Sequence, residues 1–328
     1  MKPKPIIPPV DKELLKAELD ESRLLRETNR AGNKLYIVRG WECPNVMNEI
    51  GRLREIAFRD GGGGTGEPLD IDKFDTNPAY GYSQLVLWDP SEEAIIGGYR
   101  IALCDEIVFD TKGQPIITSA HMFEFSKKFI KEYLPYTMEL GRSFVSLDYQ
   151  SSKLGAKGIF ALDNLFDGLA ALMVHYKGRM KYFFGKATIY PDFNEQARDL
   201  IQYFLRKHFG MKRNLLRIRK EVPVKYARRW RHILTGSDFK EDYKILNTEV
   251  RKMGVNIPPL VNSYMNLSSS MIYFGTGIND EFADIYDSGI MIDFDDMYPE
   301  KKKRHVESFK EGYIHLKERL RKFRKKHL

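Results

Sequence analysis

Apolar residues recur along this chain with two periods, and the order of these patterns predicts an α/β protein. Strand-like runs occupy residues 34–40, 83–89, 94–103, 137–149, 181–190, 262–275 and 289–296. Helical spacing of apolar residues occupies 46–60, 121–134, 158–176 and 194–209. Because the two kinds of segment alternate, we expect a mixed central sheet flanked by helices, without internal repeats.

Helices are also predicted at both ends of the chain. Asp11 precedes an amphipathic segment, 12–27, as an N-cap would. A basic helix is expected over 300–328, with an apolar stripe at Phe309, Tyr313, Leu316, Leu320 and Phe323. This stripe fits either an anionic membrane surface or packing on the protein itself. The predicted organisation is an N-terminal helical extension (1–33), a main domain (34–297) and a basic C-terminal helix (298–328).

Composition adds few constraints. The chain has 328 residues, of which 42% are hydrophobic, enough for one large or two smaller cores. Its two cysteines, Cys43 and Cys104, predict neither a disulfide framework nor a metal site. The first ten residues lack the apolar core of a signal peptide, and residues 158–176 are too short and too acidic to span a bilayer. A cytoplasmic location is therefore expected.

The net charge of +8 is concentrated in two blocks. Residues 301–328 hold 12 Lys/Arg against 3 Asp/Glu, and residues 206–231 hold 11 against 1. Such blocks attract acidic proteins, anionic lipids or nucleic acid, or remain solvated without a partner. Because no nucleic-acid-binding motif accompanies them, a non-catalytic nucleic-acid-binding protein is the less favoured alternative.

Several charged residues fall within or beside strand-like apolar segments. They are Arg54, Asp70, Asp72, Asp75, Arg100, Glu139 and Arg142. Buried charges are costly unless each has a partner, so their number favours a shared site. In a regular strand, side chains three apart point to opposite faces, so Glu139 and Arg142 meet only if a bulge intervenes. His121 and His175 are interpreted as surface or core histidines.

The order of elements resembles the GNAT acyltransferase fold. The charged residues, together with Phe58, resemble a spaced pattern shared by acyl-homoserine lactone synthases and hemolysin-like N-acyltransferases. Residues 257–294 are similar to the C-terminal part of the ornithine-lipid and glycine-lipid N-acyltransferases, a part that the lactone synthases lack. The resemblance covers roughly residues 34–297 and makes signal synthesis the second alternative.

The resemblance implies transfer of a fatty acyl group, typically 3-hydroxylated, from acyl carrier protein to the α-amine of glycine or ornithine, as the first step of aminolipid synthesis. An ammonium must lose a proton before it attacks a thioester, and Glu139 is the candidate base. Arg100 and Arg142 are expected either to hold the acceptor carboxylate or to fix the acidic residues. The other expected substrate-binding residues are Arg54, Phe58, Asp70, Asp72, Asp75, Glu124, Phe125 and Ser143.

The acyl donor is expected to be a carrier-protein thioester. Residues 153–159 (KLGAKGI) stand where GNAT enzymes place their pyrophosphate loop, but their glycine spacing differs, so coenzyme A is less expected and no bound cofactor is predicted. Carrier proteins are acidic, which suits the basic block at 206–231. The residues expected to contact the carrier protein or the membrane are Lys207, Arg213, Arg217, Arg228, Arg229 and Arg231. A peripheral position on the inner face of the membrane is compatible with this.

Overall fold

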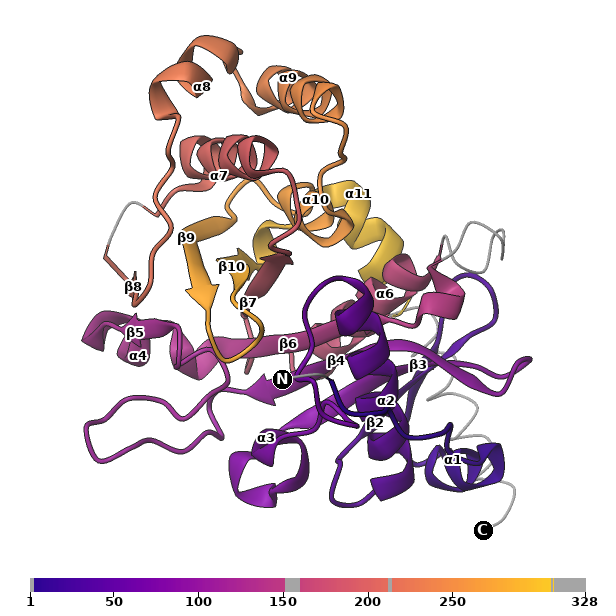
Figure 1. Ribbon diagram of the computed structural model, residues 1–328. Helices are drawn as coiled ribbons and strands as arrows, with labels where there is room; N and C mark the ends of the chain where they lie inside the picture. The colour runs from indigo at the N-terminus through magenta and orange to yellow at the C-terminus, as the bar shows by residue number, and fades with distance from the viewer. Residues whose placement is uncertain (1–2, 151–159, 212–213, 308, 310–328) are drawn as a thin grey trace.

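A computed structural model describes residues 3–150, 160–211, 214–307 and 309. The helices are α1 (Lys12–Glu18), α2 (Pro44–Asp60), α3 (Lys73–Thr76), α4 (Lys127–Glu132), α6 (Ala161–His175), α7 (Glu195–Phe209), α8 (Ala227–Ile233), α9 (Phe239–Lys252), α10 (Pro259–Met265) and α11 (Pro299–Lys302). The strands are β1 (Leu24–Glu27), β2 (Lys34–Val38), β3 (Ser83–Asp89), β4 (Ala94–Leu103), β5 (Phe123–Phe125), β6 (Thr137–Val145), β7 (Tyr182–Ile189), β8 (Leu216–Ile218), β9 (Ile272–Asn279) and β10 (Ile285–Asp293). The expected mixed α/β architecture is confirmed (Figure 1).

Within the described residues, eight strands form one mixed sheet in the order β1-β2-β3-β4-β6-β7-β10-β9. Neighbouring strands are antiparallel except β6 and β7, which run parallel. The parallel register covers only Thr137 to Leu140 of β6 against Tyr182 to Gly185 of β7, although both strands continue. The two strands therefore part in the middle of the sheet.

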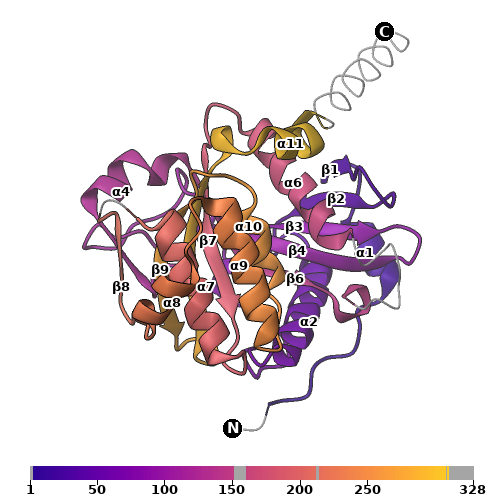
Figure 2. The ribbon, with the colours of Figure 1, turned by 90° about the horizontal axis from the view of Figure 1, so that it is seen from above.

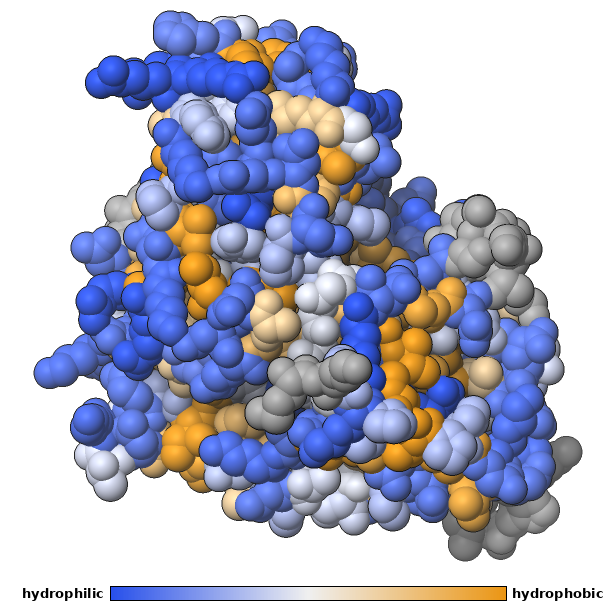
Figure 3. All heavy atoms as spheres, in the orientation of Figure 1, coloured by the Kyte–Doolittle hydropathy of each residue, from blue (hydrophilic) through white to orange (hydrophobic). Residues whose placement is uncertain are grey.

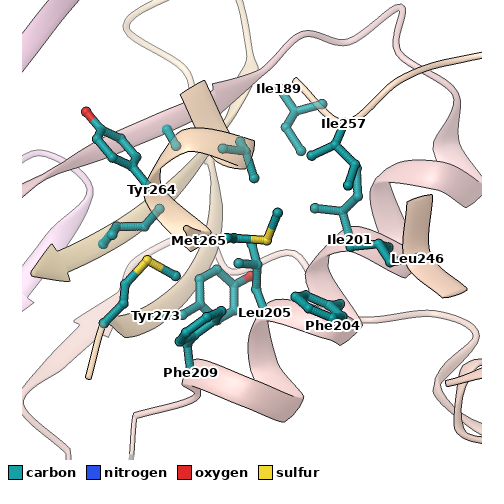
Figure 4. Packing of buried hydrophobic residues seen from close by; sticks show 14 of the residues in the cluster. Ile189, Ile201, Phe204, Leu205, Phe209, Leu246, Ile257, Tyr264, Met265 and Tyr273 are labelled. Atoms are coloured by element: carbon teal, nitrogen blue, oxygen red, sulfur yellow. The ribbon is translucent and has the colours of Figure 1, made fainter. Parts of the chain in front are cut away.

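Helices and a small second sheet cover the two faces. On one face, α6 packs on β3 and β4, and α7 and α10 pack on β9 and β7 (Figure 2). The apolar cluster under α7, α9 and α10 includes Phe204, Leu246, Met265 and Tyr273 (Figure 4). On the opposite face, α2 covers β4 and β6, while β5, β8 and α4 pack through aromatic side chains on β7. The charged residues lie on this second face.

Three predicted elements were wrong. The leading helix ends at Glu18, and Leu24–Glu27 instead forms an edge strand paired with β2. The helix expected over 121–134 begins with strand β5, because Phe123–Phe125 pairs with the distant β8. The strand expected over 262–275 is divided between helix α10 and strand β9. In each case pairing or packing with another element, rather than the local pattern of apolar residues, determines the structure.

The last described residues of the chain pack against the domain. His305, Val306 and Phe309 are buried, and the imidazole Nδ1 of His305 lies 2.7 Å from Asp167 Oδ1 of α6. Apart from Phe309, the predicted apolar stripe lies outside the described residues, as do residues 153–159 and Arg213. None of the described helices is both long enough and apolar enough to cross a membrane.

Candidate functional site

Asp75 is the centre of the charged cluster. Its side chain is only 1% exposed, and its Oδ1 accepts hydrogen bonds from Arg54 Nη1 at 3.1 Å and Gln84 Nε2 at 2.9 Å. Its Oδ2 accepts from Arg100 Nη1 at 3.0 Å. Burial alone would raise the pKa of Asp75, but Arg100 and Arg54 outweigh it and lower the pKa to about 2. The carboxylate therefore stays ionised between two buried arginines.

The spacing of Asp72 and Asp75 has a local cause. Asp72 caps the short helix α3 by accepting from Phe74 N at 2.8 Å, and Asp75 Oδ2 accepts from Asp72 N at 3.0 Å. This reciprocal capping box turns both carboxylates toward β4. There, Arg100 Nη1 donates to Asp72 Oδ1 at 2.8 Å as well as to Asp75.

The two buried arginines come from different elements. Arg54 projects from α2, is 0% exposed and donates through Nη2 to Gln84 Oε1 at 2.6 Å. Arg100 projects from β4, directly opposite Gln84 of β3 in the sheet register. Asp75 and Asp72 raise the pKa of Arg100 against the effect of burial. Both guanidinium groups bind the loop that carries the aspartates through their Nη atoms, while the Nε of each is buried without a hydrogen-bond partner in the described chain.

A β-bulge brings Glu139 and Arg142 to the same face. Gly98 pairs with Phe144 and Arg100 with Gly141, so β6 holds one more residue than β4 in this interval. Arg142 has a positive φ of 47°, which is uncommon for a residue other than glycine. The extra residue reverses the alternation of side chains along β6. Arg142 consequently reaches Asp70 and also Asp72, which Arg100 contacts as well.

Arg142 lies between acidic and aromatic side chains. Its Nε is 2.9 Å from Asp70 Oδ2, its Nη2 is 3.8 Å from Asp72 Oδ2, and its guanidinium lies 4.5 Å from the ring centre of Phe282. Phe58 packs edge-on against that ring, with the two ring centres 5.3 Å apart. Burial raises the pKa of Asp70, although Arg142 opposes this effect. Unlike Arg54 and Arg100, Arg142 keeps 20% of its side chain exposed, and Asp72 keeps 35%.

Glu139 is buried and already hydrogen-bonded. Its Oε1 accepts from Ser119 N at 2.8 Å, and its Oε2 accepts from the Tyr82 hydroxyl and from Thr118 N at 3.3 Å. Burial and the adjacent carboxylate raise the pKa of Tyr82 well above its usual value. Glu139 is thus held rigidly on the same face as Arg100 and Arg142, beside the point where β6 and β7 part.

Three further predicted residues lie elsewhere. Ser143 follows the bulge and hydrogen-bonds to Tyr99, which belongs to the opposite face. Glu124 pairs with Arg217 and Arg219 beside a cavity of about 660 Å³ that it helps to line. Phe125 is buried in the aromatic cluster under α4. In the described part of the chain, none of these three pairs with the Asp70 to Asp75 loop.

Most of the described basic residues in the block at 206–231 form ion pairs with acidic side chains. Lys207 pairs with Asp242, Arg206 with Glu221, Arg217 with Glu124, Lys220 with Asp280 and Lys225 with Glu195. Arg228 and Arg231 are exposed on α8, and Arg229 there hydrogen-bonds to Gln196. Figure 3 shows mostly hydrophilic side chains over α8 and α9 at the top of the molecule. Among described residues, no three His, Cys, Asp or Glu side chains gather as a metal site would require.

Several residues of the site were missed from the sequence. They are Tyr82, Gln84, Ser119 and Phe282. Gln84 lies directly opposite Arg100 in the sheet, and Tyr82, two residues before it, points to the same face. Aligning β3 with β4 in the sequence could therefore have identified both residues. Ser119 acts through its backbone N–H, for which residue identity gives no signal.

Comparisons with known proteins show the family to which this chain is related. Residues 53–157 match the family model described as "Acetyltransferase (GNAT) domain". A protein of Phocaeicola vulgatus named "Glycine N(alpha)-acyltransferase" is 55% identical over 307 residues, covering 93% of each chain. A protein of Bacteroides thetaiotaomicron with the same name is 53% identical over 94% of this chain and 91% of its own. No solved structure gives a significant match.

Replacing Asp75 by Asn is expected to destabilise the fold by about 3 to 5 kcal/mol at pH 7, because two buried arginines lose their shared anion. Since the pKa of Asp75 is lowered from 3.8 to about 2, its contribution is complete above pH 3.8 and is lost as the pH falls through 2. The variant should therefore lose less stability between pH 4 and 2 than the wild type. Urea unfolding across this range measures both effects, with exposed Asp60→Asn as the matched control. Equal unfolding free energies for Asp75→Asn and wild type at pH 7 would contradict this account.

Proposed function

Because this chain belongs to the family of the glycine N(alpha)-acyltransferases and is an N-acyltransferase with a GNAT domain, we propose that it transfers a fatty acyl group, typically 3-hydroxylated, from an acyl carrier protein thioester to the α-amine of glycine. The product is a monoacylated amino acid, the first intermediate of an aminolipid. The single observation that supports this most strongly is a partly exposed pair of opposite charges, Arg142 and Asp72, on the same sheet face as Glu139.

The acceptor is a zwitterion and needs one anionic and one cationic partner. Among the three arginines of the cluster, Arg54 and Arg100 are 0% and 3% exposed at the side chain, whereas Arg142 is 20% exposed. The Nε of Arg142, although 2.9 Å from Asp70 Oδ2, has no aligned hydrogen bond in the described chain. Arg142 is therefore proposed to bind the glycine carboxylate. Asp72, 3.8 Å away and 35% exposed, is proposed to attract the ammonium.

The reaction then requires the nitrogen to lose two protons and the site to stabilise an oxyanion. The ammonium first transfers one proton to Glu139, directly or through water, and the resulting amine forms a bond to the thioester carbon. The carbonyl electrons move to oxygen and return as the carbon–sulfur bond breaks; the nitrogen gives up its second proton to the departing thiolate, and Glu139 releases the first to solvent. Backbone N–H groups of β6 beyond Leu140, which have lost β7 as a partner, are proposed as oxyanion donors.

The donor is proposed to dock through α8. Arg228 and Arg231 are exposed on this helix, whereas most other basic residues of the block are paired with acids. An acidic carrier protein would meet this positive surface with favourable long-range attraction. The helix lies at the top of Figure 1, on the side of the sheet that ends in β9.

Purified protein is expected to consume acyl carrier protein thioester only when glycine is present and to form N-acylglycine, identified by mass spectrometry. Glu139→Gln should lower turnover by about 100-fold, because the amide cannot accept the proton. Release of free fatty acid at the same rate without glycine would contradict the proposal, and ornithine in place of glycine tests the acceptor.

Removing the charge of Arg142 is expected to raise the KM for glycine by about 10- to 100-fold, because a charge-assisted hydrogen bond to the carboxylate is lost. The variant is Arg142→Met, compared with exposed Arg39→Met as control. Methylamine, which lacks the carboxylate, provides the second measurement: wild type should strongly prefer glycine, and Arg142→Met should lose that preference. An unchanged preference would place the carboxylate elsewhere.

Reversing the charge of α8 with Arg228→Glu and Arg231→Glu together is expected to raise the KM for carrier-protein thioester by about tenfold at low salt, with less effect at high salt. The KM for the corresponding acyl-pantetheine, which lacks the protein, should not change. Arg251→Glu on neighbouring α9 is the matched exposed control. Equal effects on both donors would exclude α8 as the docking surface.

A further inference from the structure

A chain of polar side chains next to Glu139 has no part in the proposed chemistry so far. It runs from His121 through Asn279 of β9 to Asp287 of β10 and Lys186 of β7. Asn279 and Asp287 are each 2% exposed, so these contacts are made within the protein. Buried polar networks are costly to maintain, which makes their position informative.

His121 lies between the two loops that border the site. Its Nδ1 is 2.7 Å from the carbonyl oxygen of Thr118, and its Nε2 is 3.0 Å from Asn279 Oδ1. The carbonyl of Thr118 and the N–H of Ser119 belong to one peptide unit, and that N–H donates to Glu139 Oε1 at 2.8 Å. A single peptide thus links the imidazole to the candidate base.

The second contact reaches the loop that supports Arg142. Asn279 ends β9, and its carbonyl accepts from Phe282 N at 3.2 Å. Phe282 is the ring beneath the Arg142 guanidinium. His121 therefore connects the loop that orients Glu139 to the turn that orients Arg142.

Hydrogen positions are constrained by these partners. Asn279 donates through Nδ2 to Asp287 Oδ2 at 2.8 Å, which directs its Oδ1 toward the imidazole. Both ring nitrogens of His121 consequently face oxygen atoms, and both contacts are hydrogen bonds only in the imidazolium form. Glu281 and Asp280 from the β9–β10 turn, Lys186 from β7, Asp287 from β10 and Glu139 from β6 are the charged groups around it. Burial and Lys186 lower the pKa of His121, and Glu281, Thr118 and Asn279 oppose this effect.

We propose that His121 is a positioning residue for acyl transfer, which holds the Thr118–Ser119 peptide against Glu139 and couples it to the Phe282 turn under Arg142. A ring N–H donated to the peptide carbonyl polarises that peptide and strengthens the Ser119 N–H as a donor to the carboxylate. The inference rests on the proposed role of Glu139.

Two substitutions separate positioning from packing. His121→Phe keeps the ring volume but removes both contacts, and should lower kcat by about 10- to 100-fold while changing the KM for glycine less than about threefold. His121→Gln keeps one donor and should recover kcat to within about threefold of wild type. In His121→Phe, the acidic limb of the kcat pH profile should move up by about half a pH unit, because the ionised form of Glu139 is less well stabilised. His175→Gln, at the exposed end of α6, is the control.

Amide hydrogen exchange of the peptide covering residues 117–123 gives a readout that does not need activity. Faster exchange in His121→Phe than in His121→Gln and wild type, at equal melting temperatures, is the expected result. Wild-type exchange together with an unmoved pH profile in His121→Phe would overturn the inference. A loss of kcat that is equal in both variants and accompanied by equal losses of melting temperature would show a merely structural role. An inactive wild type would contradict the proposed function, while the exchange result would still decide for or against His121.

Discussion

The buried ion pairs of Asp75 with Arg54 and Arg100 are the constraint on which the rest of the site depends. Neither arginine is more than 3% exposed at the side chain, so each needs its carboxylate within the protein. Because Asp75 also accepts from Asp72 N, the same contacts that satisfy the arginines fix the helix α3 turn. These contacts fix the loop between α2 and β4. They also hold the partly exposed carboxylate of Asp72 in one position.

The bulge at Arg142 is the second constraint, and it depends on close backbone approach. At Gly98, a Cβ would lie 2.5 Å from the carbonyl oxygen of Leu85, so any larger residue would push β3 and β4 apart near the bulge. Without the extra residue in β6, Arg142 would point toward the apolar cluster under α6. The bulge therefore places Glu139 and Arg142, three residues apart, on the same face of the sheet. It lies where β6 and β7 separate.

The sequence predicted β3 and β4 to the residue, because each is an apolar run ended by turn residues. It also predicted that the aspartates and arginines would meet. It did not predict β1 or β5, whose residues continue a helical pattern locally and become strands only through pairing with β2 and β8. His121 shows the same limit within the site, because a lone histidine carries no periodic signal and its two partners are a backbone carbonyl and a residue 158 positions away.

Charge counted along the sequence differs from charge presented at the surface. The block at 206–231 holds 11 basic residues, yet those described on α7, β8 and the following loop pair with acids, most of which come from outside the block. Among the described residues, folding therefore leaves the uncompensated positive charge of this block on one short helix, α8. The same holds for the cluster around Asp75. Of its three arginines and three aspartates, Arg142 and Asp72 form the pair that stays partly exposed. In both regions, the charges left without full compensation are those available to a second molecule. Under the proposed function, the positive surface of α8 would attract an acidic carrier protein, and the adjacent positive and negative groups would bind a zwitterionic acceptor.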